Sequence, residues 1–155
     1  MTSPQSAIFG QKSTQFRVLE YTLQANQPIN SLLQTLASIK ETLTSVELVI
    51  GFGPALWQQI DPIEPALHFS QFNPITSPKG HQAQASQSDV FLWLHSHNHD
   101  AIIDALLWVQ YQFIGVATLA FACDGFKYRD NRDLTGFIDG SAIYGSSAAL
   151  SNHLR

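Results

Sequence analysis

The fold is decided by residues 89–126, which read DVFLWLHSHNHDAIIDALLWVQYQFIGVATLAFACDGF. The nearly continuous apolar run within residues 89–97 predicts a buried strand. Apolar side chains then recur at helical spacing over residues 102–113, and Gly115 ends this helix. A second strand, rich in apolar and small residues, is predicted over residues 116–126. The stretch therefore predicts a strand, a helix and a strand in succession.

The residues upstream repeat this order of elements. Residues 16–23 alternate as a strand does, and residues 46–52 form a short apolar run closed by a Gly-Phe-Gly-Pro turn. Between them lies a predicted amphipathic helix that Asn30 or Ser31 caps and that ends near Thr44, with apolar positions Leu32, Leu33, Leu36, Ile39 and Leu43. The complete order predicts an α+β, ferredoxin-like βαββαβ fold, in which an antiparallel sheet carries helices on one face and leaves an apolar face open.

Three segments divide the chain. A flexible arm is expected over residues 1–14, one ferredoxin-like domain over 15–140, and a Ser/Ala/Gly-rich tail over 141–155. A helical turn at residues 55–60 precedes a proline-bearing loop over residues 62–87, and loops this long are usually functional or mobile.

Charge and composition exclude several classes of function. Charged residues make up 13% of the chain, the net charge is −4 and no Lys/Arg cluster occurs, which argues against nucleic-acid binding. The low charge fits a surface rich in Gln, Ser and Thr, and equally a face buried against a second domain or another copy in a homo-oligomer. No apolar run approaches the roughly 20 residues of a membrane span. Cys123, the single cysteine, lies in an apolar run and is predicted to be buried and inert in a cytoplasmic protein.

The most specific string is DLTGFIDG at residues 133–140. Its glycines, Gly136 and Gly140, bracket Asp139 and allow the backbone to turn sharply and approach a flat ligand closely. Phe137 and Ile138 add apolar contacts, and a carboxylate in such a loop can carry a proton. An ordinary Asp-Gly turn with Phe137 docked into the core is the alternative interpretation.

This string resembles the Gly-x-x-Asp-Gly signature of DyP-type haem peroxidases. Further pieces follow in the family's order between residues 5 and 142: Gln5–Ile8, Val49–Gly53 with Trp57, Asp89–Leu92, His99-Asp100 and Asp124–Phe126. The resemblance implies a haem-dependent peroxidase that binds haem b within a pair of ferredoxin-like domains.

The resemblance also implies a role for each residue of the string. The aspartate matching Asp139 lies on the distal side of the haem, takes a proton from hydrogen peroxide and returns it to the leaving oxygen. Its unperturbed pKa near ~3.9 leaves it ionised at neutral pH. Gly136, Phe137, Ile138 and Gly140 would shape the cofactor-binding loop beside the porphyrin. An organic electron donor, dye-like or porphyrin-like, would be the second substrate.

The chain departs from the family after Gly140. Family members continue with an acidic or polar residue and then Asn-Pro, whereas this chain reads Ser141-Ala142-Ile143. The proximal histidine and a distal arginine belong to the family's C-terminal half, and neither can be carried onto a position here. The chain is therefore expected to be a truncated N-terminal half, inactive alone. The alternative is a non-catalytic dimeric ferredoxin-like module or remnant.

His95, His97 and His99 suggest a metal site less strongly. On one face of a strand they are spaced about 6.6–7 Å per step, so two neighbours could share a zinc ion. All three could do so only if the chain turned at Asn98. Polar residues at a strand end, with Asn98 or Asp100 capping the next helix, are the preferred interpretation, and no metal ligand is assigned.

Three tryptophans, Trp57, Trp93 and Trp108, could relay electrons in a peroxidase. Their strand and helix spacing favours packing into the core.

Overall fold

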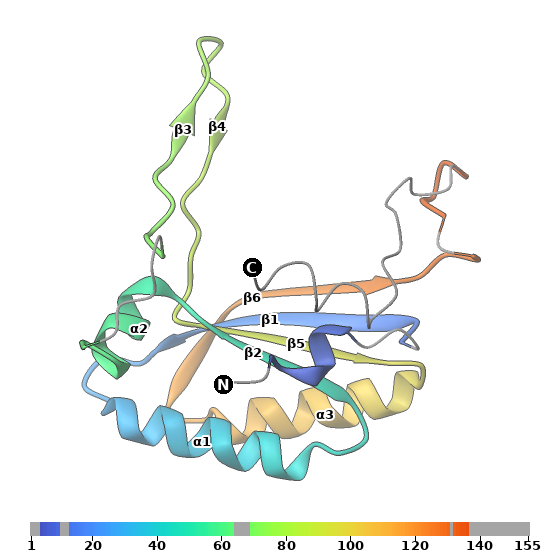
Figure 1. Cartoon of the computed structure of the whole chain (residues 1–155), viewed down its shortest axis with the longest axis horizontal. Coiled ribbons are helices and arrows are strands. Elements are labelled where there is room, and N and C mark those ends of the chain that lie inside the picture. Colours follow the sequence, from blue (N-terminus) through green and yellow to red (C-terminus); the bar gives the residue numbers. More distant parts are fainter. Residues whose placement is uncertain (1–3, 10–12, 64–68, 131, 137–155) are drawn as a thin grey trace.

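A four-stranded antiparallel sheet forms the body of the molecule, and two long helices cover one of its faces (Figure 1). The computed structural model describes residues 4–9, 13–63, 69–130 and 132–136. The strands are β1 (Gln15–Leu23), β2 (Glu47–Phe52), β5 (Val90–Ser96) and β6 (Ala117–Phe126), in the spatial order β2-β5-β1-β6. The helices are α1 (Ile29–Thr42) and α3 (His99–Gln112). This arrangement confirms the predicted ferredoxin-like βαββαβ fold.

The core fills the space between the sheet and the two helices. Alternate residues of β1 and β5 point toward the helices, and the apolar stripes of α1 and α3 meet them. Completely buried side chains include Leu19, Leu92, Leu94, Leu32, Ile39 and Val109. Each fully buried side chain of this kind contributes about 1.5–3 kcal/mol relative to an exposed one.

Tyr21 is the largest of the fully buried side chains. Its ring stacks on that of Phe113, with 4.2 Å between the ring centroids. Its hydroxyl is buried without a hydrogen-bond partner. Burial raises the pKa of the Tyr21 phenol to about 12 because the phenolate would lose its hydration.

The two helices begin in different ways. Asn98 caps α3, and its side-chain oxygen accepts hydrogen bonds from the backbone N–H groups of Asp100 and Ala101 at 2.9 and 3.4 Å. This confirms one of the two predicted caps of that helix. The predicted cap of α1 is wrong, because α1 begins at Ile29 after Pro28 and no side chain caps it. Asn30 and Ser31 lie within the first turn, so they cannot precede the helix.

β6 is an edge strand that the helices do not cover. α3 packs on β5 and β1, so the strand beyond β1 is left largely open to solvent. Residues 118–124 are all exposed, and half of the Phe121 surface is accessible. The prediction that Cys123 is buried is therefore wrong, since the thiol is exposed. An apolar run predicts a strand, but it does not reveal that the strand lies at an edge.

A short segment before β1 packs near β2 on the other side of the sheet. Residues 6–9, in the segment expected to be a flexible arm, form the 3-10 helix η1 (Ser6–Phe9), and Ala7 is buried. The Gln5 side chain forms two hydrogen bonds with Ile50, accepting from its N–H at 2.9 Å and donating to its C=O at 2.7 Å. Gln5 thus satisfies backbone groups in the middle of the β2 edge.

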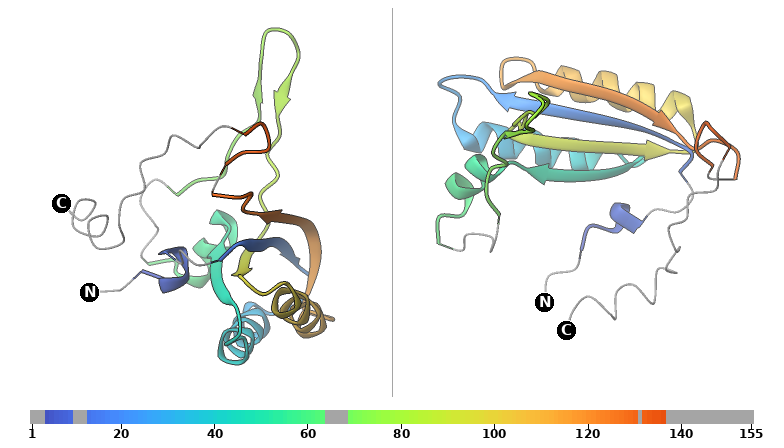
Figure 2. Two further views of the ribbon diagram at one scale, coloured as in Figure 1. Left: turned by 90° about the vertical axis from the view of Figure 1, so that its right-hand side faces the viewer. Right: turned by 90° about the horizontal axis from the view of Figure 1, so that it is seen from above.

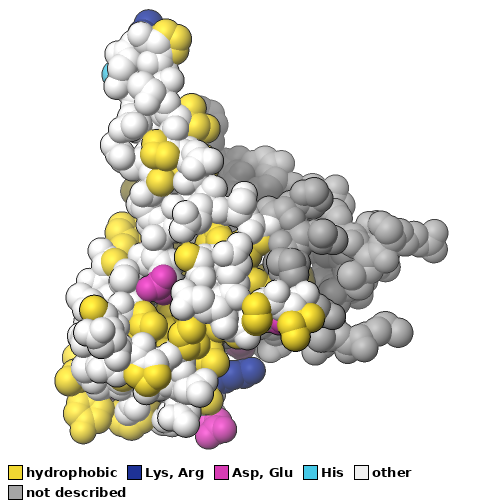
Figure 3. All heavy atoms as spheres, turned by 90° about the vertical axis from the view of Figure 1, so that its left-hand side faces the viewer, with side chains coloured by type: hydrophobic (Ala, Val, Ile, Leu, Met, Phe, Trp, Pro, Cys, Tyr) yellow, Lys and Arg dark blue, Asp and Glu magenta, His cyan; other side chains and the backbone are white. Residues whose placement is uncertain are grey.

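Residues 69–88 stand away from the sheet as a hairpin arm (Figure 2). The predicted loop over 62–87 therefore contains two short paired strands, β3 (Ile75–Thr76) and β4 (Gln82–Ala83). Figure 3 shows hydrophobic side chains exposed along this arm. Phe72 and Ile75 are two exposed hydrophobic residues of this segment. The predicted helical turn before the loop is the helix α2 (Pro54–Ile60). Among the described residues, no helix is long and apolar enough to cross a membrane.

Candidate functional site

The loop that leaves β6 leads toward the string of residues 133–140. Its first residue is tied to the sheet, because the Lys127 N–H donates to the carbonyl oxygen of Thr14 at 2.7 Å. A bridge then joins Tyr128 and Arg132, in which the Arg132 N–H donates to the Tyr128 carbonyl at 3.0 Å. Arg129 lies between them with a φ of 48°, a left-handed conformation that reverses the chain. Backbone hydrogen bonds therefore fix the start of the loop.

The Arg132 guanidinium joins two parts of this loop. Nε and Nη2 donate to the two carboxylate oxygens of Asp130 at 2.7 and 3.1 Å, a bidentate pair. Nη1 donates to the carbonyl oxygen of Gly136 at 3.0 Å. The pairing with Arg132 lowers the pKa of the exposed Asp130 carboxyl below its ordinary value. The Arg132 guanidinium thus connects the Asp130 carboxylate to the Gly136 carbonyl, six positions later in the chain.

A tight turn over residues 133–136 precedes the remainder of the predicted signature. The Gly136 N–H donates to the Asp133 carbonyl at 3.0 Å. Oδ1 of Asp133 accepts from the N–H of Thr135 at 2.9 Å and from its hydroxyl at 2.5 Å. Gly136 has a φ of +94°, which side chains disfavour, so glycine is required at this position.

Of the predicted site residues, only Gly136 lies in the described part of the chain. Asp139, Phe137, Ile138 and Gly140 lie outside the described residues, so their roles stay predictions. The ion pair between Asp130 and Arg132 was not predicted from the sequence. A carboxylate two positions before an arginine is too common in solvated loops to be a specific signal for this pair.

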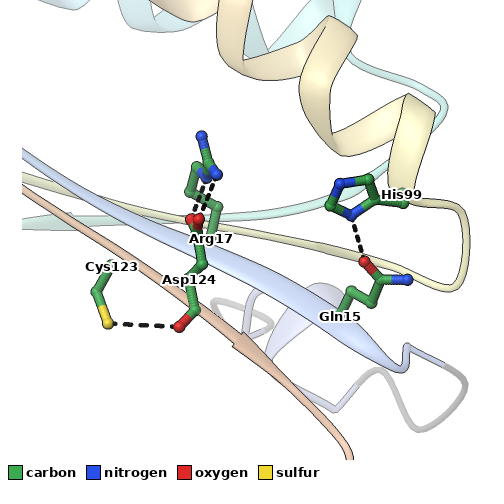
Figure 4. Close-up of polar contacts among 5 residues, drawn as sticks. All are labelled: Gln15, Arg17, His99, Cys123 and Asp124. Atoms are coloured by element: carbon green, nitrogen blue, oxygen red, sulfur yellow. Dashed lines mark hydrogen bonds and ion pairs between the residues drawn. The ribbon is translucent and has the colours of Figure 1, made fainter.

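A shallow pocket of about 190 Å³ lies between the start of α3 and the ends of β1 and β6. In it Arg17 Nη2 donates to Asp124 Oδ2 at 2.5 Å, and His99 hydrogen-bonds Gln15 (Figure 4). The four polar side chains pair with one another within the chain. Pockets for drug-sized ligands usually hold roughly 300–1,000 Å³, so this hollow is too small to enclose a haem.

The three histidines of the suggested metal site do not converge. His95 is buried, and its ring nitrogens hydrogen-bond Ser13 Oγ at 2.8 Å and the Ala7 carbonyl at 2.9 Å. A carbonyl only accepts, so Nε2 carries the proton in the neutral ring and Nδ1 faces the Ser13 hydroxyl. His97 and His99 are exposed, and His99 begins α3. Within the described ranges, no three metal-ligating side chains form a group.

The tryptophans are partly buried. Trp57 packs beside Phe52, with 5.9 Å between ring centroids, and Trp108 lies beside Tyr111 on α3 at 6.1 Å. Trp93 lies next to the His95 ring at 4.7 Å. None of the three belongs to the buried cluster between sheet and helices, contrary to the predicted core packing. A role for these tryptophans in electron transfer stays a prediction.

Comparison with known proteins identifies the family. The family model described as "Dyp-type peroxidase, N-terminal" matches residues 5–127. This chain therefore belongs to the DyP-type peroxidase family. The match ends before Gly136, so it does not reach the predicted site residues.

Two curated relatives and two solved structures agree with this assignment. A dye-decolorizing peroxidase of Mycolicibacterium paratuberculosis is 25% identical over 131 residues, which is 83% of this chain and 36% of that protein. A dye-decolorizing peroxidase of Rhodococcus erythropolis is 29% identical over 103 residues, which is 65% of this chain and 29% of that protein.

The solved structures share the fold. A DypB variant of Rhodococcus jostii RHA1 in complex with heme has a TM-score of 0.77 and 22% identity, and the match covers 95% of this chain and 50% of that protein. A DyP-type peroxidase protein of Shewanella oneidensis has a TM-score of 0.73 and 19% identity, and the match covers 89% of this chain and 48% of that protein. This chain thus spans about a third of the curated relatives and about half of the solved ones.

The two described pockets, of about 190 and 260 Å³, are both too small to enclose a haem. Both ring nitrogens of His95, the one buried histidine among the described residues, are engaged within the chain. The segment predicted to face the porphyrin lies outside the described residues.

Proposed function

We propose that this chain contributes the proton-carrying part of a haem-dependent peroxidase site. The observation that carries the proposal is the turn over residues 133–136, held by Arg132, which ends three residues before Asp139. Membership of the DyP-type family over residues 5–127 supports it. In this proposal the glycine-ended turn sets the start of the short segment that carries Asp139.

In this proposal Asp139 accepts a proton from hydrogen peroxide and returns it to the leaving oxygen. A carboxylate with an ordinary pKa near ~3.9 is ionised at neutral pH and can accept that proton. Phe137 and Ile138 would offer apolar contact, and Gly136 and Gly140 would allow close approach of the backbone. Haem b, when bound, would supply the redox chemistry that connects peroxide reduction with oxidation of a dye-like or porphyrin-like donor.

We further propose that the chain is inactive alone and functions in the cytoplasm. The chain spans about half the length of the solved relatives, and the pocket at the start of α3 is too small to enclose a haem. The single cysteine fits a reducing compartment. Activity would require a second ferredoxin-like half.

The test is a hemin titration followed by visible absorption. The chain alone is titrated first, and then a version extended to the relatives' length with the C-terminal half of Rhodococcus jostii DypB. The proposal expects weak, non-saturating binding by the chain alone and, in the extended protein, a saturable Soret band and peroxide-dependent dye oxidation. Asp139→Asn in the extended protein should lower turnover by about 10²–10⁴-fold, the usual contribution of a general acid–base group. Unchanged turnover in that variant would remove Asp139 from the mechanism.

A non-catalytic dimeric module is the second candidate function. The observation that favours it is the exposed β6 edge, where Leu119, Phe121 and Phe126 show substantial apolar surface. A second copy of the chain could cover this surface. Light scattering of the purified chain would test the idea, and a monomer at micromolar concentration would count against it.

A further inference from the structure

A second shallow hollow, of about 260 Å³, lies where the base of the hairpin arm meets β1. Its lining consists of one residue of β1 and four of the arm: Glu20, Phe72, Gln84, Ser86 and Gln87. None of these residues is basic. Lys79, the one lysine of residues 69–88, lies in the turn between β3 and β4 at the far end of the arm (Figure 1). The hollow therefore contains a carboxylate and no cation among its lining residues.

Glu20 is the charged residue of the hollow. In the strand register it lies opposite Phe91 on β5 and opposite Phe121 on β6, so both of its neighbours across the sheet are aromatic. Glu20 is half-buried, and within the described ranges of the chain no hydrogen bond or ion pair engages its carboxylate. Aromatic neighbours limit the water around a charge and lower the effective dielectric constant, which strengthens its attraction for a cation.

The two glutamine amides of the hollow add hydrogen-bond acceptors. Nε2 of Gln84 donates to Oε1 of Gln82 at 2.8 Å, and Nε2 of Gln87 donates to the Phe72 carbonyl at 3.3 Å. These bonds engage the amide nitrogens within the arm and leave both Oε1 atoms without a partner among the described residues. A carboxylate and two amide oxygens together form an acceptor set for a ligand with several N–H donors.

We propose that this hollow binds an organic cation through an ammonium or guanidinium group. Such a group carries one positive charge and roughly three to five N–H donors, which match the carboxylate and the amide oxygens. Phe72 supplies an aromatic ring to the lining, and aromatic rings attract organic cations. A hard metal ion such as Ca²⁺ instead takes six or more oxygen ligands, usually several carboxylates. The described part of the chain contains no group of three metal-ligating side chains.

The bound cation would contact both the sheet and the arm, because Glu20 belongs to β1 and the other lining residues belong to the arm. The hollow is smaller than the roughly 300–1,000 Å³ of drug-sized pockets, so it accommodates a charged head group and not a large molecule. The same head group can come from a free amine or guanidine compound or from a lysine or arginine side chain of another protein.

The experiment is a titration of the 155-residue chain with butylguanidinium, followed by nuclear magnetic resonance. The amide signals of Gln84 and Gln87 should shift and saturate, with a Kd on the order of 1 mM. Butylurea, which has a similar shape and no charge, should leave them unmoved. A blocked Gly-Arg-Gly peptide separates the two sources. Tighter binding of the peptide than of butylguanidinium assigns the site to a protein side chain, and equal or weaker binding assigns it to a free compound.

Variants locate the binding energy. Glu20→Gln removes the charge and keeps the shape of the side chain, so it should weaken binding about tenfold or more. Glu47→Gln is the matched control, because Glu47 is exposed on β2 and does not line the hollow. It changes the net charge by the same amount and should bind as the parent chain does. Phe72→Leu should weaken binding about two- to fivefold, the usual effect of an exposed cation–π contact. Unchanged amide signals from the core of β5 show that each variant is folded.

Four outcomes would overturn the inference. The first is the absence of a saturable shift with butylguanidinium, and the second is equal binding of butylurea. The third is equal weakening by Glu20→Gln and Glu47→Gln, which would reveal only a general attraction to a negatively charged chain. The fourth is displacement of butylguanidinium by an equal concentration of Ca²⁺, which would assign the hollow to a metal ion. None of these results involves haem or turnover, so the proposed function stands or fails separately.

Discussion

The ring of Phe16 on β1 lies across Gly125 on β6, in the space that a side chain at position 125 would occupy. A β-carbon built on Gly125 would be 2.0 Å from Phe16 Cζ. The two residues are direct partners in the antiparallel register of β1 and β6. An aromatic ring that covers a glycine on the neighbouring strand compensates for the missing side chain of the glycine.

This contact predicts that Gly125→Ala destabilises the chain by about 1–3 kcal/mol, the usual cost of overpacking. The ring of Phe16 can rotate away, so Phe16→Ala should remove most of the penalty in the double variant. Gly53→Ala should cost more, because its β-carbon would be 2.2 Å from the backbone oxygen of Ser88, which has no such freedom. Urea denaturation of the four variants measures these free energies of unfolding, and equal costs at positions 125 and 53 would contradict the argument.

Asn98→Ala should lower the free energy of unfolding by about 0.5–2 kcal/mol, the usual cost of losing a helix cap. Asn98→Asp keeps an acceptor for the Asp100 and Ala101 N–H groups and should have little effect. Thermal denaturation of both variants checks this. A parent-like alanine variant would show that the cap contributes nothing.

The phenol of Tyr21 should ionise with a pKa of about 12. Because folding raises this pKa above the ordinary value of 10, the contribution to stability is complete below pH 10 and is lost as the pH rises toward 12. An ultraviolet titration of phenolate absorbance, compared with Tyr21→Phe, measures it. The phenylalanine variant removes a buried hydroxyl without a partner and should not be destabilised by more than about 1 kcal/mol.

Asp130 should titrate below the ordinary aspartate value of 3.8. Since folding lowers this pKa, the ion pair is present above the ordinary value and is lost as the pH falls through the folded one. Carboxyl carbon shifts measure the titration, and Arg132→Gln should return it to the ordinary range. A normal Asp130 pKa in the parent chain would mean that the pair with Arg132 does not form in solution.

Cys123 should be accessible to a thiol reagent in the native protein, without unfolding. The structure exposes it on β6, and it is the only cysteine in the chain. A stopped-flow assay with and without denaturant checks the accessibility. Reaction only after unfolding would support the buried thiol that the apolar run predicted.

The sequence predicted the elements well wherever the pattern is local. Helical spacing over residues 102–113 and the cap at Asn98 depend on neighbours a few positions apart, and both agree with α3. The exposure of Cys123 depends on strand order, which brings together distant segments and leaves β6 at the edge. The hairpin of β3 and β4 stands in solvent with both strands exposed, so it has no apolar alternation to detect.

The site was predictable only in part. Gly136 was chosen for its freedom of backbone conformation, and its φ of +94° agrees with that reasoning. The clamp of Arg132 on Asp130 is local in sequence, but charged residues two positions apart are common in solvated loops and gave no specific signal. His95 was predicted to be one of the polar residues at a strand end. It is buried, and its ring hydrogen-bonds Ala7 and Ser13, which are far away in sequence.

The hydrogen bonds between Gln5 and Ile50 bear on how copies of this chain can assemble. The amide of Gln5 occupies the middle of the β2 edge as an adjacent strand would, so that edge cannot accept another chain there. The β6 edge has no such cover among the described residues. A sheet in which one edge strand is blocked and the other is free can pair with a further strand only at the free edge. An edge strand of a second copy could therefore pair with β6 but not with the middle of β2, where Gln5 already bonds the backbone.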